Sequence, residues 1–255
     1  MTYDRRGHRR LGALLGERVV DLPDLIGHPA YPTTMEALVQ SNGGTVLDAA
    51  GAALAREDAE RYVVETPRLL APLLPTALRS ADAVEGARPV VGPDDTVRWP
   101  SRAGWLEFRP KIAAILRRAI ADPLAREDVP AMVFGYTLVG DFVVHAGTGD
   151  PDPSSEGCAV SLGPCVLTPD ELDPQTAYVT VRVDGKEWAK GNLNGTARTL
   201  LLDVQVASRD GQLSAGEAFA SGPFELERFE HRIWPGAQIE VDAEGIGVLR
   251  NRLGR

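Results

Sequence analysis

The sequence is poor in the side chains that build disulfide frameworks and zinc sites. It contains two cysteines, Cys158 and Cys165, and four histidines in 255 residues. Two cysteines are too few for a disulfide framework, and the histidines form no His-Glu-x-x-His or similar cluster. We therefore expect no disulfide-stapled domain and no zinc, and we interpret the cysteines as reduced, semi-buried thiols rather than as a redox pair.

Long hydrophobic runs and clustered positive charge are also missing. No apolar run approaches the length of a membrane span, and the polar start Met1–Arg6 lacks the hydrophobic region of a secretory signal. The formal net charge is -9 and the pI is near 5.0. Because binding to nucleic acid or anionic membrane needs a positive face, we expect neither as a partner, and we expect a cytoplasmic location.

The composition is that of a globular protein, with 44% hydrophobic and 25% charged residues. Three prolines, Pro67, Pro72 and Pro75, punctuate an otherwise apolar stretch, which we interpret as a linker. This predicts a small N-terminal domain over residues 1–66 and a larger domain over residues 67–255.

The first 66 residues show the patterns of a small α/β module. Two short apolar runs flank Gly16-Glu17-Arg18 and predict a hairpin. Thr34 is placed to cap a helix over Met35–Gln40, and residues Val46–Tyr62 carry apolar side chains at helical spacing.

From Pro89 onward, short apolar runs separated by glycine and proline predict a mainly β domain, hence an α+β chain overall. One of these strands ends in Asp184-Gly185, a strong hairpin signal, and one helix is expected near residues 196–207. The predicted strands are Lys111–Leu116, Ala131–Val144, Val160–Leu167, Tyr178–Val183, Ile239–Val241 and Ile246–Leu249.

Several segments, in this order and spacing, resemble the fumarylacetoacetate hydrolase family over nearly the whole chain. They are Val91–Pro100, Trp105–Leu116, Phe134–Asp141, Leu162–Leu172, Leu213–Glu217 and Trp234–Asn251. The resemblance implies a rolled mixed β-sheet domain behind a small N-terminal α/β domain, and it implies a homodimer.

The resemblance also locates a metal site whose ligands differ here. In the family, a Glu-x-Glu strand and the aspartate of Gly-Tyr-Thr-x-x-Asn-Asp bind a divalent cation. The corresponding residues are Arg109, Lys111 and Asp141. Because Mg²⁺ and Ca²⁺ need several oxygen ligands and would be repelled by two cations, we predict no metal and no cofactor.

Other family positions have changed as well. The His–Glu pair of the family's lid corresponds to residues 80–88, where no histidine occurs, and a family lysine and arginine align with Ser154 and His145. Without the metal, the lysine and the water-activating pair, the carbon–carbon hydrolysis of the family has no chemistry left.

The remaining polar residues give the candidate site. We predict Asp141, His145 and Lys111 as catalytic, and Arg109, Tyr136 and Arg198 as substrate-binding. Asp141 and His145 are four residues apart and would share a face, so an Asp–His general base is one interpretation, with a structural histidine as the alternative.

Two functions stay open. The first is a metal-independent enzyme that binds an anionic or enolisable carbonyl compound, with lyase, isomerase, dehydratase or cyclase chemistry in a specialised biosynthetic pathway. The second is a catalytically inactive relative that binds a ligand or a partner. In that case Arg109 and Lys111 only neutralise Asp141 in a relic site.

Overall fold

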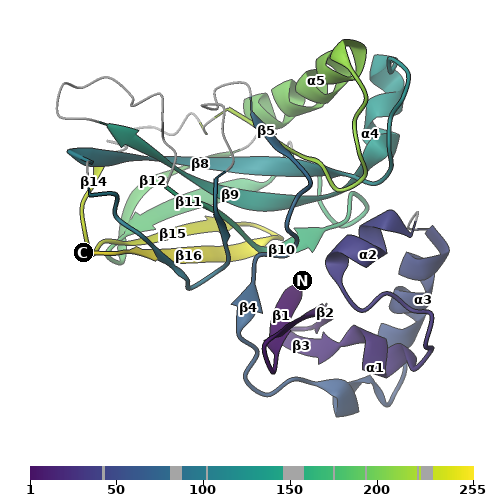
Figure 1. Cartoon of the computed structure of the whole chain (residues 1–255). Helices are drawn as coiled ribbons and strands as arrows, with labels where there is room; N and C mark the ends of the chain where they lie inside the picture. The colour runs from purple at the N-terminus through teal and green to yellow at the C-terminus, as the bar shows by residue number, and fades with distance from the viewer. Residues whose placement is uncertain are drawn as a thin grey trace.

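The computed structural model describes residues 1–41, 44–80, 88–101, 103–145, 158–174, 176–192, 194–222, 224 and 232–255, with the side chains of residues 194–199 excepted. The described residues form sheets of four, seven and five strands (Figure 1). The predicted mainly β, α+β architecture is confirmed.

The four-stranded sheet belongs to the N-terminal module and has the order β3-β2-β1-β4. The predicted hairpin is present as β2 and β3, joined at Gly16, which has a φ of 61°. The strands are β1 (Thr2–Arg5), β2 (His8–Leu15), β3 (Arg18–Asp21) and β4 (Leu69–Leu70).

Helices α1 (Leu22–Ile26), α2 (Met35–Gln40) and α3 (Gly44–Leu54) complete the module. Helix α2 has the predicted bounds, and the Thr34 hydroxyl accepts a hydrogen bond from the Ala37 amide as its cap. The helix predicted over residues 46–62 is wrong beyond Leu54, where a turn leads into the short helix η1 (Ala59–Tyr62).

Side-chain bonds hold the chain in that turn. The Arg56 guanidinium donates to the carbonyl of Leu25 and to the carboxylate of Asp58, two residues further along. These bonds fix a turn where helical spacing alone would have continued the helix.

The linker region is divided between two sheets. Strand β4 pairs with β1, whereas β5 (Leu78–Ser80) is the first strand of the seven-stranded sheet. The chain therefore changes sheet between Leu70 and Leu78, and the domain boundary after residue 66 stays a prediction.

The seven-stranded sheet has the order β5-β13-β8-β9-β10-β6, with β14 pairing on β8. Its centre is the antiparallel pair β8 (Trp105–Leu116) and β9 (Val133–His145), which runs without a register shift from Trp105 opposite His145 to Ile115 opposite Gly135. The other strands are β6 (Val90–Val91), β10 (Val160–Leu167), β13 (Ala218–Ala220) and β14 (Arg232–Ile233).

The five-stranded sheet has the order β12-β11-β15-β16-β7. The predicted Asp184-Gly185 turn joins β11 to β12, with both residues at positive φ, as a two-residue hairpin loop requires. Its strands are β7 (Thr96–Val97), β11 (Tyr178–Val183), β12 (Lys186–Asn192), β15 (Gln238–Ala243) and β16 (Gly247–Leu253).

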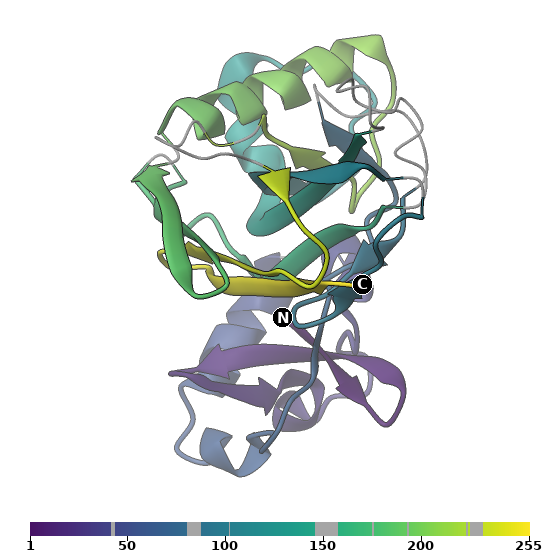
Figure 2. The ribbon, with the colours of Figure 1, turned by 90° about the vertical axis from the view of Figure 1, so that its left-hand side faces the viewer.

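The layers are clear when Figures 1 and 2 are compared. The five-stranded sheet lies on one side of β8 and β9, and helix α5 (Asn194–Asp210) lies on the other, beside η2 (Arg126–Asp128) and α4 (Val129–Met132). Helix α5 contains the predicted helix at residues 196–207. Among the described residues, no helix is long and apolar enough to span a membrane.

Alternate residues of the central strands serve two different cores. Even-numbered residues such as Ile112 and Leu138 belong to the core shared with the five-stranded sheet. Odd-numbered residues such as Ala113 and Val139 belong to a second core that continues into the N-terminal module. Both cysteines are free and buried.

Candidate active site

The polar residues of the candidate site come from one face of the central strand pair. Side chains two residues apart on a strand leave the same face, so the odd-numbered residues from Trp105 to Lys111 share a face of β8. The register places Asp141 of β9 directly opposite Arg109, and His145 opposite Trp105. Ala113 and Ile115 continue the same face of β8 with apolar side chains. The polar residues therefore lie at the other end of that face, toward Trp105.

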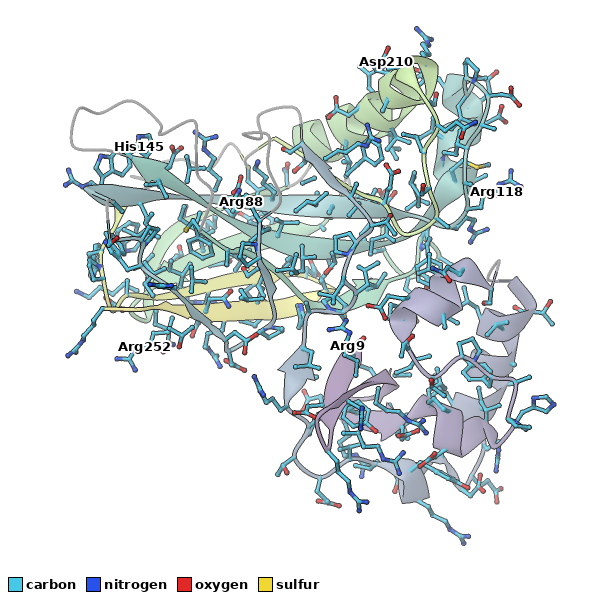
Figure 3. All side chains as sticks on the ribbon, viewed as in Figure 1. Arg9, Arg88, Arg118, His145, Asp210 and Arg252 are labelled. Atoms are coloured by element: carbon cyan, nitrogen blue, oxygen red, sulfur yellow. The ribbon has the colours of Figure 1, made fainter. Side chains whose placement is uncertain are left out.

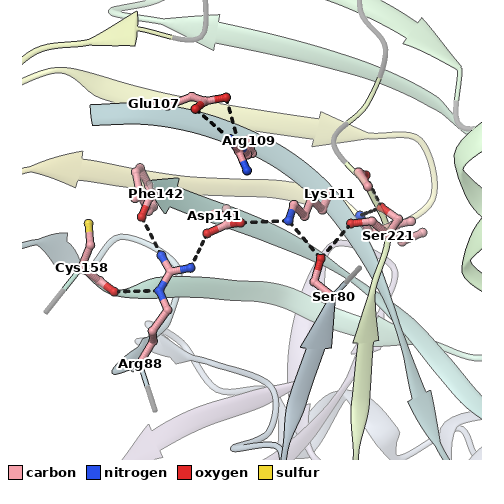
Figure 4. Close-up of polar contacts among 12 residues, drawn as sticks. Ser80, Arg88, Glu107, Arg109, Lys111, Asp141, Phe142, Cys158 and Ser221 are labelled. Atoms are coloured by element: carbon pink, nitrogen blue, oxygen red, sulfur yellow. Dashed lines mark hydrogen bonds and ion pairs between the residues drawn. The ribbon is translucent and has the colours of Figure 1, made fainter. Parts of the chain in front are cut away.

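Lys111 and Asp141 form the centre of the site. The Lys111 ammonium lies 2.9 Å from Oδ2 of Asp141 and donates to the Ser80 hydroxyl at 3.1 Å (Figure 4). Lys111 is only 1% exposed and Asp141 only 4%. Three strands, β5, β8 and β9, therefore bring a buried amine and a buried carboxylate together with the hydroxyl of half-buried Ser80.

Arg88 is the second cation on Asp141. Its Nη1 donates to Oδ1 of Asp141 at 2.5 Å, while Nη2 donates to the carbonyl of Phe142 and Nε to that of Cys158 (Figure 4). Figure 3 shows Arg88 and His145 on the larger domain, well apart from Arg9 of the N-terminal module. Sequence reasoning missed Arg88, because no motif separates it from the other arginines of the chain.

The charges around Asp141 determine its protonation. Burial alone would raise the pKa of this carboxyl, but the Lys111 ammonium and the Arg88 guanidinium outweigh burial and hold the pKa below its ordinary value. Asp141 is thus a permanent anion at neutral pH and a weak base. Its part is to hold the two cations in place.

Arg109 has a different partner from the one expected. Although it lies opposite Asp141 in the register, its guanidinium makes a two-pronged contact with the carboxylate of Glu107, at 2.8 and 2.9 Å. Lys111 therefore contacts Asp141, as predicted. The ion pair of Arg109 within the described part of the chain is instead with Glu107.

His145 is also paired with Glu107. Its Nε2 lies 2.8 Å from Oε2 of Glu107, and its ring stacks on Trp105 with the centroids 3.7 Å apart and the planes at 8°. The predicted Asp141–His145 pair is wrong, because four residues of a strand span roughly 13 Å even on one face. The Arg232 guanidinium lies 5.5 Å from the centroid of the Trp105 ring.

Glu107 is the hub of this second cluster. Burial would raise the pKa of its carboxyl, but hydrogen bonds from Arg109 and His145 lower it below its ordinary value. Glu107 is therefore a carboxylate at neutral pH that holds an imidazole and a guanidinium together.

One predicted substrate-binding residue, Tyr136, does not join these clusters. Tyr136 lies opposite Ala114 in the register and packs in the core shared with the five-stranded sheet, on the face of β9 away from Asp141. Its prediction as a substrate-binding residue is contradicted by this placement. Arg198 belongs to α5, but its side chain lies outside the described residues, as do residues 81–87 and Ser154.

The donors at the site do not suit a divalent metal. Hard cations need several oxygen ligands, and both oxygens of Asp141 already bind cations, Arg88 and Lys111. Arg109 and Lys111, which we predict at the positions of the two family glutamates, offer no lone pair to a metal while they are charged. Among the described residues, no group of three His, Cys, Asp or Glu side chains could hold a metal.

A hollow lies elsewhere in the molecule, between the N-terminal module and the sheet that this module covers. It encloses about 860 Å³ and has a mainly apolar lining that includes Leu11, Leu47, Leu54, Phe134 and Leu167. It is separate from the Lys111–Asp141 cluster, because none of the residues of that cluster lines it.

Solved structures with the same fold cover nearly the whole chain. Fumarylacetoacetate hydrolase from Exiguobacterium antarcticum is 20% identical with a TM-score of 0.75, covering 99% of this chain and 98% of its own. Maleylpyruvate hydrolase from Sphingobium sp. SYK-6, solved with manganese(II) and pyruvate, is 23% identical with a TM-score of 0.73, covering 100% and 99%.

A probable 2-hydroxyhepta-2,4-diene-1,7-dioate isomerase from Mycobacterium abscessus is 18% identical, with a TM-score of 0.69 and coverage of 95% of this chain and 94% of its own. At these identities the likeness shows the fold alone. No curated protein matches the sequence. The model of the fumarylacetoacetate (FAA) hydrolase C-terminal family matches residues 72–254, well over half of the chain. The chain therefore belongs to the fumarylacetoacetate hydrolase family.

Proposed function

We propose that this protein is a metal-independent enzyme that acts on an anionic or enolisable carbonyl compound. The observation that carries the proposal is the buried ammonium of Lys111, held by Asp141 beside Arg88. Among the described side chains of this cluster, two are cations and one is an anion. Such a cluster favours a ligand that is negative or becomes negative during reaction.

The two cations offer the electrostatic part of carbonyl chemistry. Negative charge develops on a carbonyl oxygen when a neighbouring carbon loses a proton, and fixed cations in a site with little water stabilise that charge strongly. Asp141 fixes both cations, so they need no reorganisation when the charge develops. Lyase, isomerase, dehydratase and cyclase reactions at a carbon next to a carbonyl group pass through such an enolate.

His145 is a second proton-transfer group in this proposal, at a distance from Asp141. A carboxylate partner orients an imidazole, and Glu107 supplies this partner at 2.8 Å. Since His145 lies roughly 13 Å along β9 from Asp141, it serves the far end of an extended substrate and not the carbon beside a carbonyl group bound at Lys111.

The proposal includes a cytoplasmic homodimer that works in a specialised biosynthetic pathway. The dimer and the location rest on the family, and the pathway rests on the departure of this site from the metal ligands of the family.

A catalytically inactive ligand-binding or partner protein is the second candidate. The near-complete burial of Lys111 and Asp141 favours it, because an ion pair that is buried and hydrogen-bonded can be a purely structural feature. The apolar hollow of about 860 Å³ gives such a protein a place for a ligand.

Two measurements on protein treated with chelator test the proposal. Calorimetry should show binding of oxalate, an analogue of the pyruvate enolate, with at least tenfold weaker affinity in Lys111→Met and unchanged affinity in Lys190→Met, an exposed lysine. Proton NMR in D₂O should show catalysed exchange of the pyruvate methyl protons. Oxalate binding without exchange would favour the inactive reading, and binding that requires Mn²⁺ would refute metal independence.

A further inference from the structure

We infer that Lys111 is a covalent catalytic residue that forms an imine with the carbonyl group of the substrate. The inference rests on the proposed function, because it assigns the carbonyl of that substrate to the ammonium of Lys111. It goes further by replacing electrostatic polarisation with a covalent bond, and it limits the substrate to ketones and aldehydes, 2-oxo acids and 1,3-diketones in particular.

The chemical type of the buried cation is the first argument. Of the 27 basic residues in the chain, 24 are arginine and three are lysine. Two of the lysines, Lys186 and Lys190, are exposed on β12, and the third is Lys111, the most deeply buried cation at the site. This chain therefore uses arginine almost everywhere that it needs a positive charge.

A purely structural pair with Asp141 would be better made by arginine. Its planar guanidinium binds a carboxylate with two parallel hydrogen bonds and loses less hydration on burial than an ammonium does. The chain uses this arrangement nearby, where Arg109 grips Glu107. What lysine offers and arginine does not is a primary amine that can lose a proton and attack a carbonyl carbon.

The neighbours of Lys111 Nζ match the steps of imine formation. Asp141 Oδ2, at 2.9 Å, orients the ammonium, which donates one proton to the incoming carbonyl oxygen and so frees the nitrogen lone pair. The nitrogen attacks the carbonyl carbon, and a second proton from the same nitrogen lets the former carbonyl oxygen leave as water. Overall, an ammonium and a ketone give a protonated imine and water, with no net gain or loss of protons.

The charge balance of the cluster is the same before and after the reaction. The protonated imine carries the positive charge that the ammonium carried, so Asp141 keeps a cationic partner. The imine also withdraws electrons from the neighbouring carbon and stabilises the carbanion left when that carbon loses a proton or a carboxylate. Arg88, on the other oxygen of Asp141, adds positive charge to the cluster, which favours a 2-oxo acid over a neutral ketone.

Acetylacetone and pyruvate test the inference on the full-length protein. Acetylacetone forms a stable, UV-absorbing enaminone with an amine of this kind, and borohydride traps the imine of pyruvate as a secondary amine. We expect one equivalent of either label on the peptide that contains Lys111. Lys186 and Lys190 should be labelled no more than lysines are in the unfolded protein. Both are exposed amines without a carboxylate of the site beside them.

Variants separate this inference from the proposed function. Lys111→Arg keeps a cation on Asp141 but removes the primary amine, so it should lose all labelling at this site, whereas Lys190→Arg should label like the wild type. Oxalate binding without labelling of wild-type Lys111 overturns the imine and leaves the proposed function standing. Absence of oxalate binding overturns the proposed function itself, and label spread evenly over the three lysines overturns the special reactivity of Lys111.

Discussion

Replacement of Asp141 by asparagine should destabilise the protein severely. The carboxylate binds Arg88 through Oδ1 and Lys111 through Oδ2, and it is 4% exposed. Asp141→Asn keeps the size of the side chain but leaves two buried cations without their shared anion. Removing one partner from a buried ion pair costs about 3–5 kcal/mol, and we expect a loss of unfolding free energy in this range.

Urea denaturation at neutral pH, followed by circular dichroism, measures this loss. The matched control is Asp242→Asn, which removes a carboxylate from the exposed pair with Arg182, whose side chains are 39% and 34% exposed. An exposed pair of this kind contributes at most about 1 kcal/mol. Equal losses in the two variants would refute the view that Asp141 is the buried anion that organises the site.

The pH dependence gives a second check on the same variant. Because the pKa of Asp141 is lower in the folded than in the unfolded protein, its contribution is fully present above the ordinary aspartate pKa. The contribution is lost as the pH falls through the lowered pKa of the folded protein. The difference between wild type and Asp141→Asn should therefore shrink in acid, and a difference that grew in acid would contradict the assigned direction.

Three further predictions concern neighbouring residues. Glu107→Gln should lower the unfolding free energy by about 1–3 kcal/mol in urea denaturation, since it weakens the hydrogen bonds of Glu107 to Arg109 and His145. That difference should also fade in acid, because the pKa of Glu107 is lowered in the folded protein. Tyr136→Phe should leave oxalate affinity unchanged in calorimetry, and a tenfold loss would contradict its place on the opposite face of β9. Gly135→Ala should cost about 1–3 kcal/mol in thermal unfolding, since its Cβ would lie 2.6 Å from the carbonyl oxygen of Leu167.

Sequence patterns predicted the strands well because burial imposes a strict alternation on them. The Tyr178–Val183 strand has the predicted bounds, and its Asp-Gly turn follows directly from the need for two positive φ angles. The long strands β8 and β9 were also expected, although β8 begins at Trp105, six residues before its predicted start. Its first half carries polar side chains, which an apolar pattern does not reveal.

The site was harder to predict than the strands. Strand alternation correctly placed Lys111 and Asp141 on one face of the sheet. The family motif indicates which residues of β8 and β9 lie opposite each other. Alternation says nothing about the direction in which a long side chain turns, so the contact of Arg109 with Glu107 could not be foreseen. The spacing of Asp141 and His145 suggested a pair, but it left open whether the segment was helical.

Arg88 lay beyond prediction for another reason. Its partners are 53 and 70 residues away in the chain, at Asp141 and at the carbonyl of Cys158, and no local pattern encodes contacts of that range. Glu107 could not be predicted either, because its contact with His145 depends on the pairing of β8 with β9.

The contacts of Arg88 have a consequence for redesign of this protein. One side chain holds the carbonyls of Phe142 and Cys158, which lie on either side of residues 146–157, and it directly follows residues 81–87. Arg88 thus ties described residues on both sides of 146–157 to the strand that carries Asp141. A change at Arg88 would release these carbonyls and the partner of Asp141 together, so redesign of the Lys111–Asp141 cluster has to keep this arginine.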